Sequence, residues 1–313
     1  MAVEALHRRI KTPTLPAVRV EGELERILER ATEGVRPSDR LIRFYNWIGR
    51  LPLRLGAFLL ALSSPQGVRF FWRVAVRRRT DAGLQILYNY QGFWSLRPWN
   101  WAAAVFLESY NCRSVRSRGR FVQEAVRFLL GYLARERAAS DGHGRGLVVV
   151  SLGSGSASQL LQGFADNGFA EDEAHIVLVD RDPRALRAGR SNAQRLGLEA
   201  AVEAFEGTIG QFLRRAAPES VDFFEMVGLA DYFKDHQLRR YLRGVYAALR
   251  PGGFFLGANI SSREEADYAH GAACWPRMFY RSQEQLVQML KQAGFQTIWT
   301  GACGLYTVWV ARK

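Results

Sequence analysis

The sequence predicts an α/β fold in which a doubly wound sheet follows an all-helical N-terminal region. Leu147–Leu152 (LVVVSL) is too apolar to face water on either side, as expected of an interior parallel strand. Short apolar runs then alternate with helical segments up to the C-terminus, whereas residues 1–140 show only helical spacing. We therefore expect a helical lid or substrate region at 1–140 and a ligand-binding sheet domain at 147–313.

The first strand ends in a turn that suits a ligand. Gly153 and Gly155 let the backbone turn sharply with no Cβ in the way, and the helix expected at 157–164 points free N–H groups at the same place. A second buried strand ends at Asp180, where a carboxylate can accept hydrogen bonds from both hydroxyls of a ribose. These features predict a nucleoside site. The NAD pattern is incomplete, because its third glycine would fall at Ser158.

Further strands complete the sheet. Residues 202–205 and 221–227 are expected strands, residues 249–253 (LRPGG) precede a fifth, and residues 295–300 and 305–311 form a terminal pair. Together these features resemble the class I S-adenosylmethionine (SAM) dependent methyltransferases. The resemblance implies a seven-stranded Rossmann-like sheet, a transferase activity and SAM as cosubstrate, with no metal.

The resemblance also implies roles for individual residues. In the family the glycine loop lies under the methionine part of SAM, the acid after the second strand holds the ribose, and the loop after the third strand approaches the adenine. The cofactor-binding residues carried over are Ser151, Gly153, Ser154, Gly155, Asp180, Arg181, Glu206, Gly207, Thr208, Glu225, Met226 and Val227. The alternative for Glu206 is an ordinary solvated carboxylate.

Two of these positions are unusual. The family often has Asp or Glu two residues before the first glycine, where this chain has Ser151. Glu225 lies in a very apolar strand, and burying a carboxylate costs several kcal/mol unless it is paired. We therefore expect Glu225 to have a protein or ligand partner.

Three segments are similar to those of a sub-group of small-molecule methyltransferases. They are Glu225–Leu229 (EMVGL), the segment 275–282 with its Trp-Pro pair and Tyr-Arg-Ser triplet, and Val115–Arg118 (VRSR). Aromatic residues are dense in residues 81–111, which would suit either core packing or helices lying across a nucleotide site. The substrate-binding candidates are Tyr88, Tyr90, Arg116, Arg118, Tyr280 and Arg281.

Methyl transfer needs mainly in-line placement and exclusion of water, with a base only if the acceptor must lose a proton. The candidates for that base are Asp231, Tyr232, His236 and His270. Two other activities remain open. A SAM-consuming enzyme such as an azetidine-2-carboxylate synthase would close a ring and release methylthioadenosine. A non-catalytic protein of this fold could bind nucleic acid.

The charge distribution bears on the last alternative. Residues 1–146 hold 25 Arg plus Lys and 12 Asp plus Glu, whereas residues 147–313 hold 18 of each, so the whole excess of +13 lies in the first half. Only four basic residues are lysines, so a compositional bias explains the arginines without a nucleic-acid partner. Three widely spaced cysteines, the lack of a secretory signal and the lack of a membrane-spanning run favour the cytoplasm. With the resemblance, we expect an enzyme that methylates a small molecule of secondary metabolism.

Overall fold

The computed structural model describes residues 20–51, 87–88, 90, 107–141, 146–169, 173–272 and 275–313. The helical spacing of the sequence also predicts helices at 53–62 and 67–79. Both segments, and most of the aromatic segment 81–111, lie outside these described residues.

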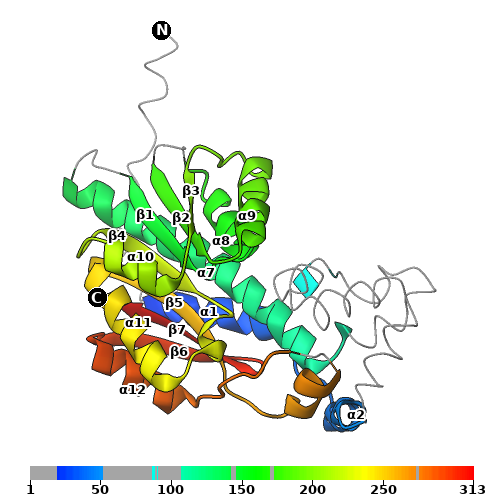
Figure 1. Ribbon diagram of the computed structural model, residues 1–313. Helices are drawn as coiled ribbons and strands as arrows, with labels where there is room; N and C mark the ends of the chain where they lie inside the picture. Colours follow the sequence, from blue (N-terminus) through cyan, green and yellow to red (C-terminus); the bar gives the residue numbers. More distant parts are fainter. Residues whose placement is uncertain are drawn as a thin grey trace.

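Seven strands form one sheet, in the order β3-β2-β1-β4-β5-β7-β6 (Figure 1). Neighbours among β1 to β5 run parallel, and β7 runs antiparallel to both β5 and β6. This arrangement confirms the predicted seven-stranded α/β fold. The strands are β1 Leu147–Leu152, β2 Ala174–Asp180, β3 Val202–Glu206, β4 Val221–Met226, β5 Leu249–Ile260, β6 Thr297–Cys303 and β7 Tyr306–Arg312.

Helices cover both faces of the sheet. In the described residues they are α1 Val20–Thr32, α2 Asp39–Gly49, α7 Tyr110–Asp141, α8 Ser158–Ala165, α9 Pro183–Arg195, α10 Ile209–Arg215, α11 Asp235–Ala248 and α12 Gln283–Ala293, with a 3-10 turn η5 at Ala230–Tyr232 and a π-helical turn η6 at Tyr268–Ala272. None of the described helices is long and apolar enough to cross a membrane.

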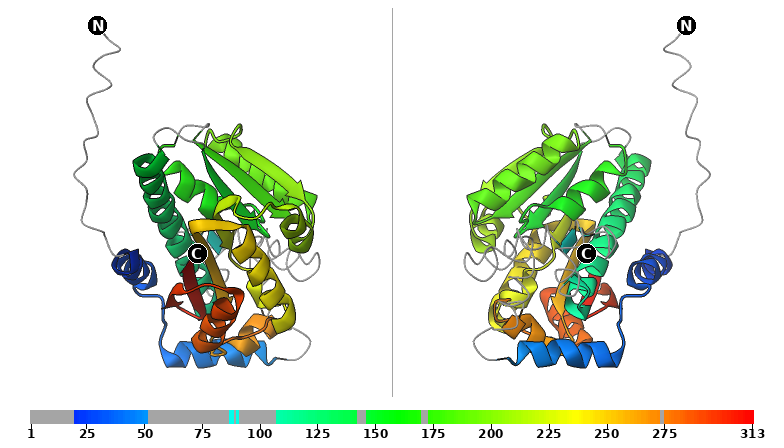
Figure 2. Two further views of the ribbon diagram at one scale, coloured as in Figure 1. Left: turned by 90° about the vertical axis from the view of Figure 1, so that its left-hand side faces the viewer. Right: turned by 90° about the vertical axis from the view of Figure 1, so that its right-hand side faces the viewer.

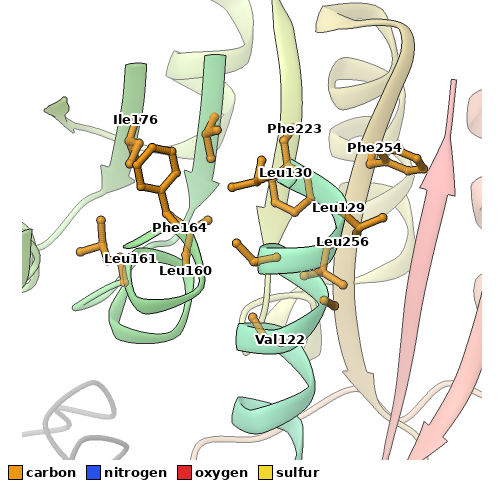
Figure 3. Close-up of a cluster of buried hydrophobic side chains, with 14 of the residues drawn as sticks. Val122, Leu129, Leu130, Leu160, Leu161, Phe164, Ile176, Phe223, Phe254 and Leu256 are labelled. Atoms are coloured by element: carbon orange, nitrogen blue, oxygen red, sulfur yellow. The ribbon is translucent and has the colours of Figure 1, made fainter. Parts of the chain in front are cut away.

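Alternate residues of each strand face opposite helical layers, which explains why the strands are apolar throughout. Val149 packs in one core with α1, α7, α8 and α9, whereas its neighbour Val150 packs in another with α11 and α12. Figure 3 shows side chains of α7, such as Leu129 and Leu130, meeting Phe223 and Leu256 of the sheet. α1 contributes Leu24 and Ile27 to this core, so the expected N-terminal helical region packs directly on the sheet.

The fifth strand differs from the prediction. The Pro251–Gly253 turn was expected to separate α11 from a strand beginning at Phe254, but β5 begins at Leu249, immediately after α11. Val221 pairs with Leu249 and Phe223 with Phe254, so the register shifts between the two pairs. Gly252, with φ +82°, provides the left-handed conformation that this irregularity needs.

A third buried cluster lies beyond the carboxyl end of β5. Side chains of α2, including Tyr45, pack there against Tyr268 of η6 and against Tyr110 at the start of α7. Figure 2 shows α2 lying along this end of the molecule. The N-terminal region and the long connection after β5 are thereby joined, next to the edge at which the parallel strands end.

Candidate functional site

The glycine turn after β1 is fastened to the end of β2. Gly153 and Ser154 donate backbone hydrogen bonds to the Val179 carbonyl, at 2.8 and 3.0 Å. Gly155 donates its N–H to Asp180 Oδ2 at 3.0 Å. Gly153 has φ +67°, and a Cβ there would lie 2.3 Å from a Leu229 methyl carbon. Both the conformation and the space therefore demand glycine at this position.

Asp180 holds its own loop together. Its second oxygen, Oδ1, accepts the Asp182 N–H at 2.9 Å, and the side chain is only partly buried. Each carboxylate oxygen has two acceptor sites, so Asp180 keeps acceptor capacity toward a ligand after these two bonds. The neighbouring Arg181 is exposed.

The loop after β3, which the resemblance assigns to the adenine side, lies beside Asp180. Glu206 is the register partner of Asp180, and Gly207 donates its N–H to the Asp180 carbonyl at 2.9 Å. Glu206 is exposed. The Thr208 hydroxyl accepts the Gln211 N–H and caps α10, so the protein itself uses that oxygen.

The partner expected for Glu225 is Ser151. Ser151 Oγ donates to Glu225 Oε2 at 2.5 Å, and both residues are buried. Burial raises the pKa of Glu225 to about 7, although the hydrogen bond from Ser151, the Arg118 charge and the Val227 N–H all favour the carboxylate. The intervening Met226 points its side chain into the core under α11.

Arg118 of α7 is a buried cation that lacks a carboxylate partner within ion-pair distance in the described part of the chain. Its guanidinium lies 4.4 Å from the Tyr306 ring centre, and Nη2 is 3.4 Å from Tyr88 Oη. Nη2 would also lie 3.3 Å from a Cβ on Gly228, which places the guanidinium beside the end of β4.

Two buried polar atoms near these strand ends are left without a hydrogen bond in the described structure. They are Arg118 Nε and the Ser154 hydroxyl. Buried polar groups are nearly always satisfied, by protein, water or ligand. The unpaired atoms fit a polar, anionic portion of a ligand lying over the glycine turn, as the carboxylate of SAM would.

The other substrate candidates lie apart from Arg118. Arg116 donates to the Leu107 carbonyl at 2.7 Å and lies over the ring of Tyr90. It points away from Arg118 because two residues along a helix turn a side chain to roughly the opposite side. Arg281 is buried, and protein acceptors take its N–H groups: Asn259 Oδ1 at 2.7 Å, the Ala230 carbonyl at 3.1 Å, Asp235 Oδ1 at 3.0 Å and the Phe233 carbonyl.

The candidate bases are divided between two places. Asp231 is buried, accepts the Ile260 N–H at 2.5 Å and has a pKa that burial raises against the opposing charge of Arg118. Tyr232 packs against the cluster around α2, and burial raises its pKa as well. His270 lies elsewhere, with Nε2 3.2 Å from Tyr280 Oη. His236 is exposed.

His270 and Tyr280 line a cavity of about 630 Å³ beyond the carboxyl end of β5. Arg263 and Arg277 line it too, and the sequence argument did not select them. The one available signal was the presence of three arginines among the aromatic residues of the long connection 261–281. The described residues contain no cluster of side chains able to hold a metal ion.

Comparisons with known proteins agree with the fold. Residues 149–253 match the methyltransferase domain family. A solved structure of a possible exported protein from Bordetella parapertussis superposes with a TM-score of 0.59 at 18% identity, covering 94% of this chain and 96% of that one. The DszA carbon methyltransferase gives a TM-score of 0.52 at 13% identity, covering 79% of this chain and 65% of that one. No curated protein matches the sequence.

Proposed function

Because the chain belongs to the class I SAM-dependent methyltransferase superfamily and is a SAM-dependent transferase, we propose that it methylates a small molecule of secondary metabolism. One observation carries the proposal: the glycine turn, Asp180, Glu225 and the unpaired Arg118 and Ser154 atoms gather at the adjoining ends of β1, β2 and β4. Ligands of open α/β sheets bind at this edge.

The residues present fit SAM part by part. Asp180 accepts hydrogen bonds from the ribose hydroxyls, and Glu206 and Gly207 lie on the adenine side. Arg118 and the Ser154 hydroxyl bind the methionine carboxylate, and Glu225 faces its ammonium group. SAM supplies a sulfonium methyl group that is already electrophilic.

The contribution of the chain is then to place the acceptor in line with the methyl group and to exclude water. Tyr88 and Tyr306 flank Arg118 and close the methionine side from solvent. Asp231 is a second buried carboxyl whose charge interacts with Arg118, and its raised pKa suits a group that takes up a proton when an acceptor loses one. We place the helical lid at residues 1–140 and the SAM domain at 147–313.

A cytoplasmic location is part of the proposal. It is supported by the two cysteines in the described residues, Cys112 and Cys303, which are both buried free thiols. The basic N-terminal half is not assigned a nucleic-acid partner, because many of its arginines are used internally: Arg30 pairs with Glu124, and Arg137 with Asp222.

Incubation of the protein with SAM, followed by mass spectrometry, tests the reaction. S-adenosylhomocysteine that forms only when a small-molecule extract is added supports methyl transfer. Methylthioadenosine released from SAM alone would replace the proposal with intramolecular cyclisation. Salt-dependent retention on RNA without any SAM turnover would replace it with nucleic-acid binding.

A further inference from the structure

The cavity beyond β5 holds more positive charge than its own residues neutralise. Arg263, Arg277 and Arg281 line it together with a single carboxylate, that of Asp235. Arg281 forms an ion pair with this carboxylate, with Nε 3.0 Å from Asp235 Oδ1. Among the described residues, neither Arg263 nor Arg277 forms an ion pair. Two guanidinium groups therefore border one cavity with no anionic partner there.

The same cavity has an aromatic and apolar wall. Trp275, Met278 and Phe279 contribute to it, and the Tyr280 ring lies 4.7 Å from the Arg263 guanidinium carbon. The Tyr280 hydroxyl contacts His270 Nε2 at 3.2 Å, which holds the ring in place. A volume of about 630 Å³ lies within the range of pockets that bind small molecules. Cationic and apolar walls together suit a small organic anion.

The cavity also adjoins the candidate SAM site. Phe279 donates its N–H to the Asp231 carbonyl at 2.7 Å, and Arg281 Nη1 donates to the Ala230 carbonyl at 3.1 Å. Both acceptors belong to η5, which directly follows Leu229, the residue against Gly153. The short turn η5 is therefore hydrogen-bonded to two residues that line the cavity, Phe279 and Arg281, and connects them to the end of β4.

We propose that this cavity binds a small organic anion, a carboxylate or phosphate carried on an aromatic or apolar body, with Arg263 and Arg277 as its counter-charges. The further step, that this anion is the methyl acceptor, rests on the proposed function. Arg281 is then a positioning residue, because it fixes η5 and the start of α11 against the cavity wall.

Anion titrations of the full chain, followed by NMR of the histidine rings, test the site. The chain has five histidines, and the His270 signals are those lost in the His270→Gln variant. Benzoate should shift the His270 signals, and the double variant Arg263→Gln/Arg277→Gln should weaken this binding at least about tenfold. Arg214→Gln, which removes an exposed arginine of α10, should leave it unchanged.

Inorganic phosphate serves as a second probe. Binding of phosphate as tight as that of benzoate assigns the site to the charge alone, and tighter binding of benzoate assigns it to a carboxylate on an aromatic body. The proposal fails if neither anion shifts the His270 signals, or if the double variant binds both as tightly as the parent protein. Both substituted arginines are exposed, so the double variant should fold.

Calorimetry with SAM separates this inference from the proposed function. The double variant should bind SAM as the parent protein does, because the cavity that both arginines line includes neither the glycine turn nor Asp180. A protein that binds benzoate but not SAM would retain the anion site and lose the proposed function. A protein that binds SAM but neither benzoate nor phosphate would keep the proposed function and lose the anion site.

Discussion

Ser151 Oγ donates a 2.5 Å hydrogen bond to Glu225 Oε2, between register partners on adjacent strands β1 and β4. The sequence lacks the acid expected two residues before Gly153, and the structure holds a carboxylate at the same level on the next strand. We infer that Glu225 takes the role of the missing β1 acid toward the methionine ammonium of SAM.

Replacing Glu225 by Gln should weaken SAM binding. The amide keeps the size of the side chain but removes the charge that attracts the ammonium group, so we expect a loss of affinity of about 1.5–3 kcal/mol. Calorimetry measures it, with the exposed Glu203→Gln on β3, a residue with no role in the proposed site, as matched control. Equal SAM affinity in Glu225→Gln and the parent protein would remove Glu225 from the site.

The same substitution should change how stability depends on pH. The pKa of Glu225 rises from 4.5 to about 7 on folding, so between these values the folded state holds a proton that the unfolded state has lost. This stabilising contribution is complete below pH 4.5 and lost as pH rises to about 7.

Relative to Glu225→Gln, the free energy of unfolding of the parent protein should therefore fall by roughly 3 kcal/mol across that window. Urea unfolding at several pH values measures the difference. Glu265, whose pKa burial also raises to about 7, is present in both proteins and cancels. Two parallel stability curves would show that Glu225 ionises normally.

Arg118 and Arg116 provide a matched pair on one helix. Arg118→Lys keeps the positive charge near Glu225 and Asp231 but removes Nε and the planar fork, so SAM affinity should fall about tenfold or more. Arg116→Lys should leave SAM affinity unchanged, because Arg116 contacts Leu107 and Tyr90 instead. An equal effect of both substitutions would mean that the losses come from the helix rather than from a ligand contact.

Asp180→Ala should weaken SAM binding by about 1.5–3 kcal/mol, through the loss of a charge-assisted hydrogen bond to the ribose. Part of the loss is indirect, since Asp180 also accepts the Gly155 N–H. Adenosine, which carries the ribose but not the methionine, should lose affinity to a similar extent. If adenosine binding is unaffected, Asp180 does not contact the ribose.

The sheet and its ligand edge could be predicted from the sequence because they depend on local patterns. The apolar run 147–152 is itself strand β1, Gly153 follows it directly, and Asp180 is the last residue of β2. The predicted start of β5 was wrong because the Pro251–Gly253 segment reads as a turn in the sequence. In the fold, β5 pairs with β4 on both sides of this segment, so the segment becomes an irregularity within the strand.

The electrostatic contacts depend on pairs distant in sequence, and here the sequence was less informative. The pattern around Glu225 required a partner but could not identify Ser151, 74 residues earlier. It grouped Arg116 with Arg118, although the fold buries one toward β4 and turns the other toward Tyr90. Arg263 and Arg277 resemble ordinary solvated loop residues until the cavity brings them together.

A crystal structure of the protein with S-adenosylhomocysteine tests the central claim most directly. We predict density over the glycine turn, with the ribose hydroxyls on Asp180, the carboxylate on Arg118 and the Ser154 hydroxyl, and the ammonium group facing Glu225. A ligand bound elsewhere, or a strand edge that stays empty at saturating S-adenosylhomocysteine, would contradict the account.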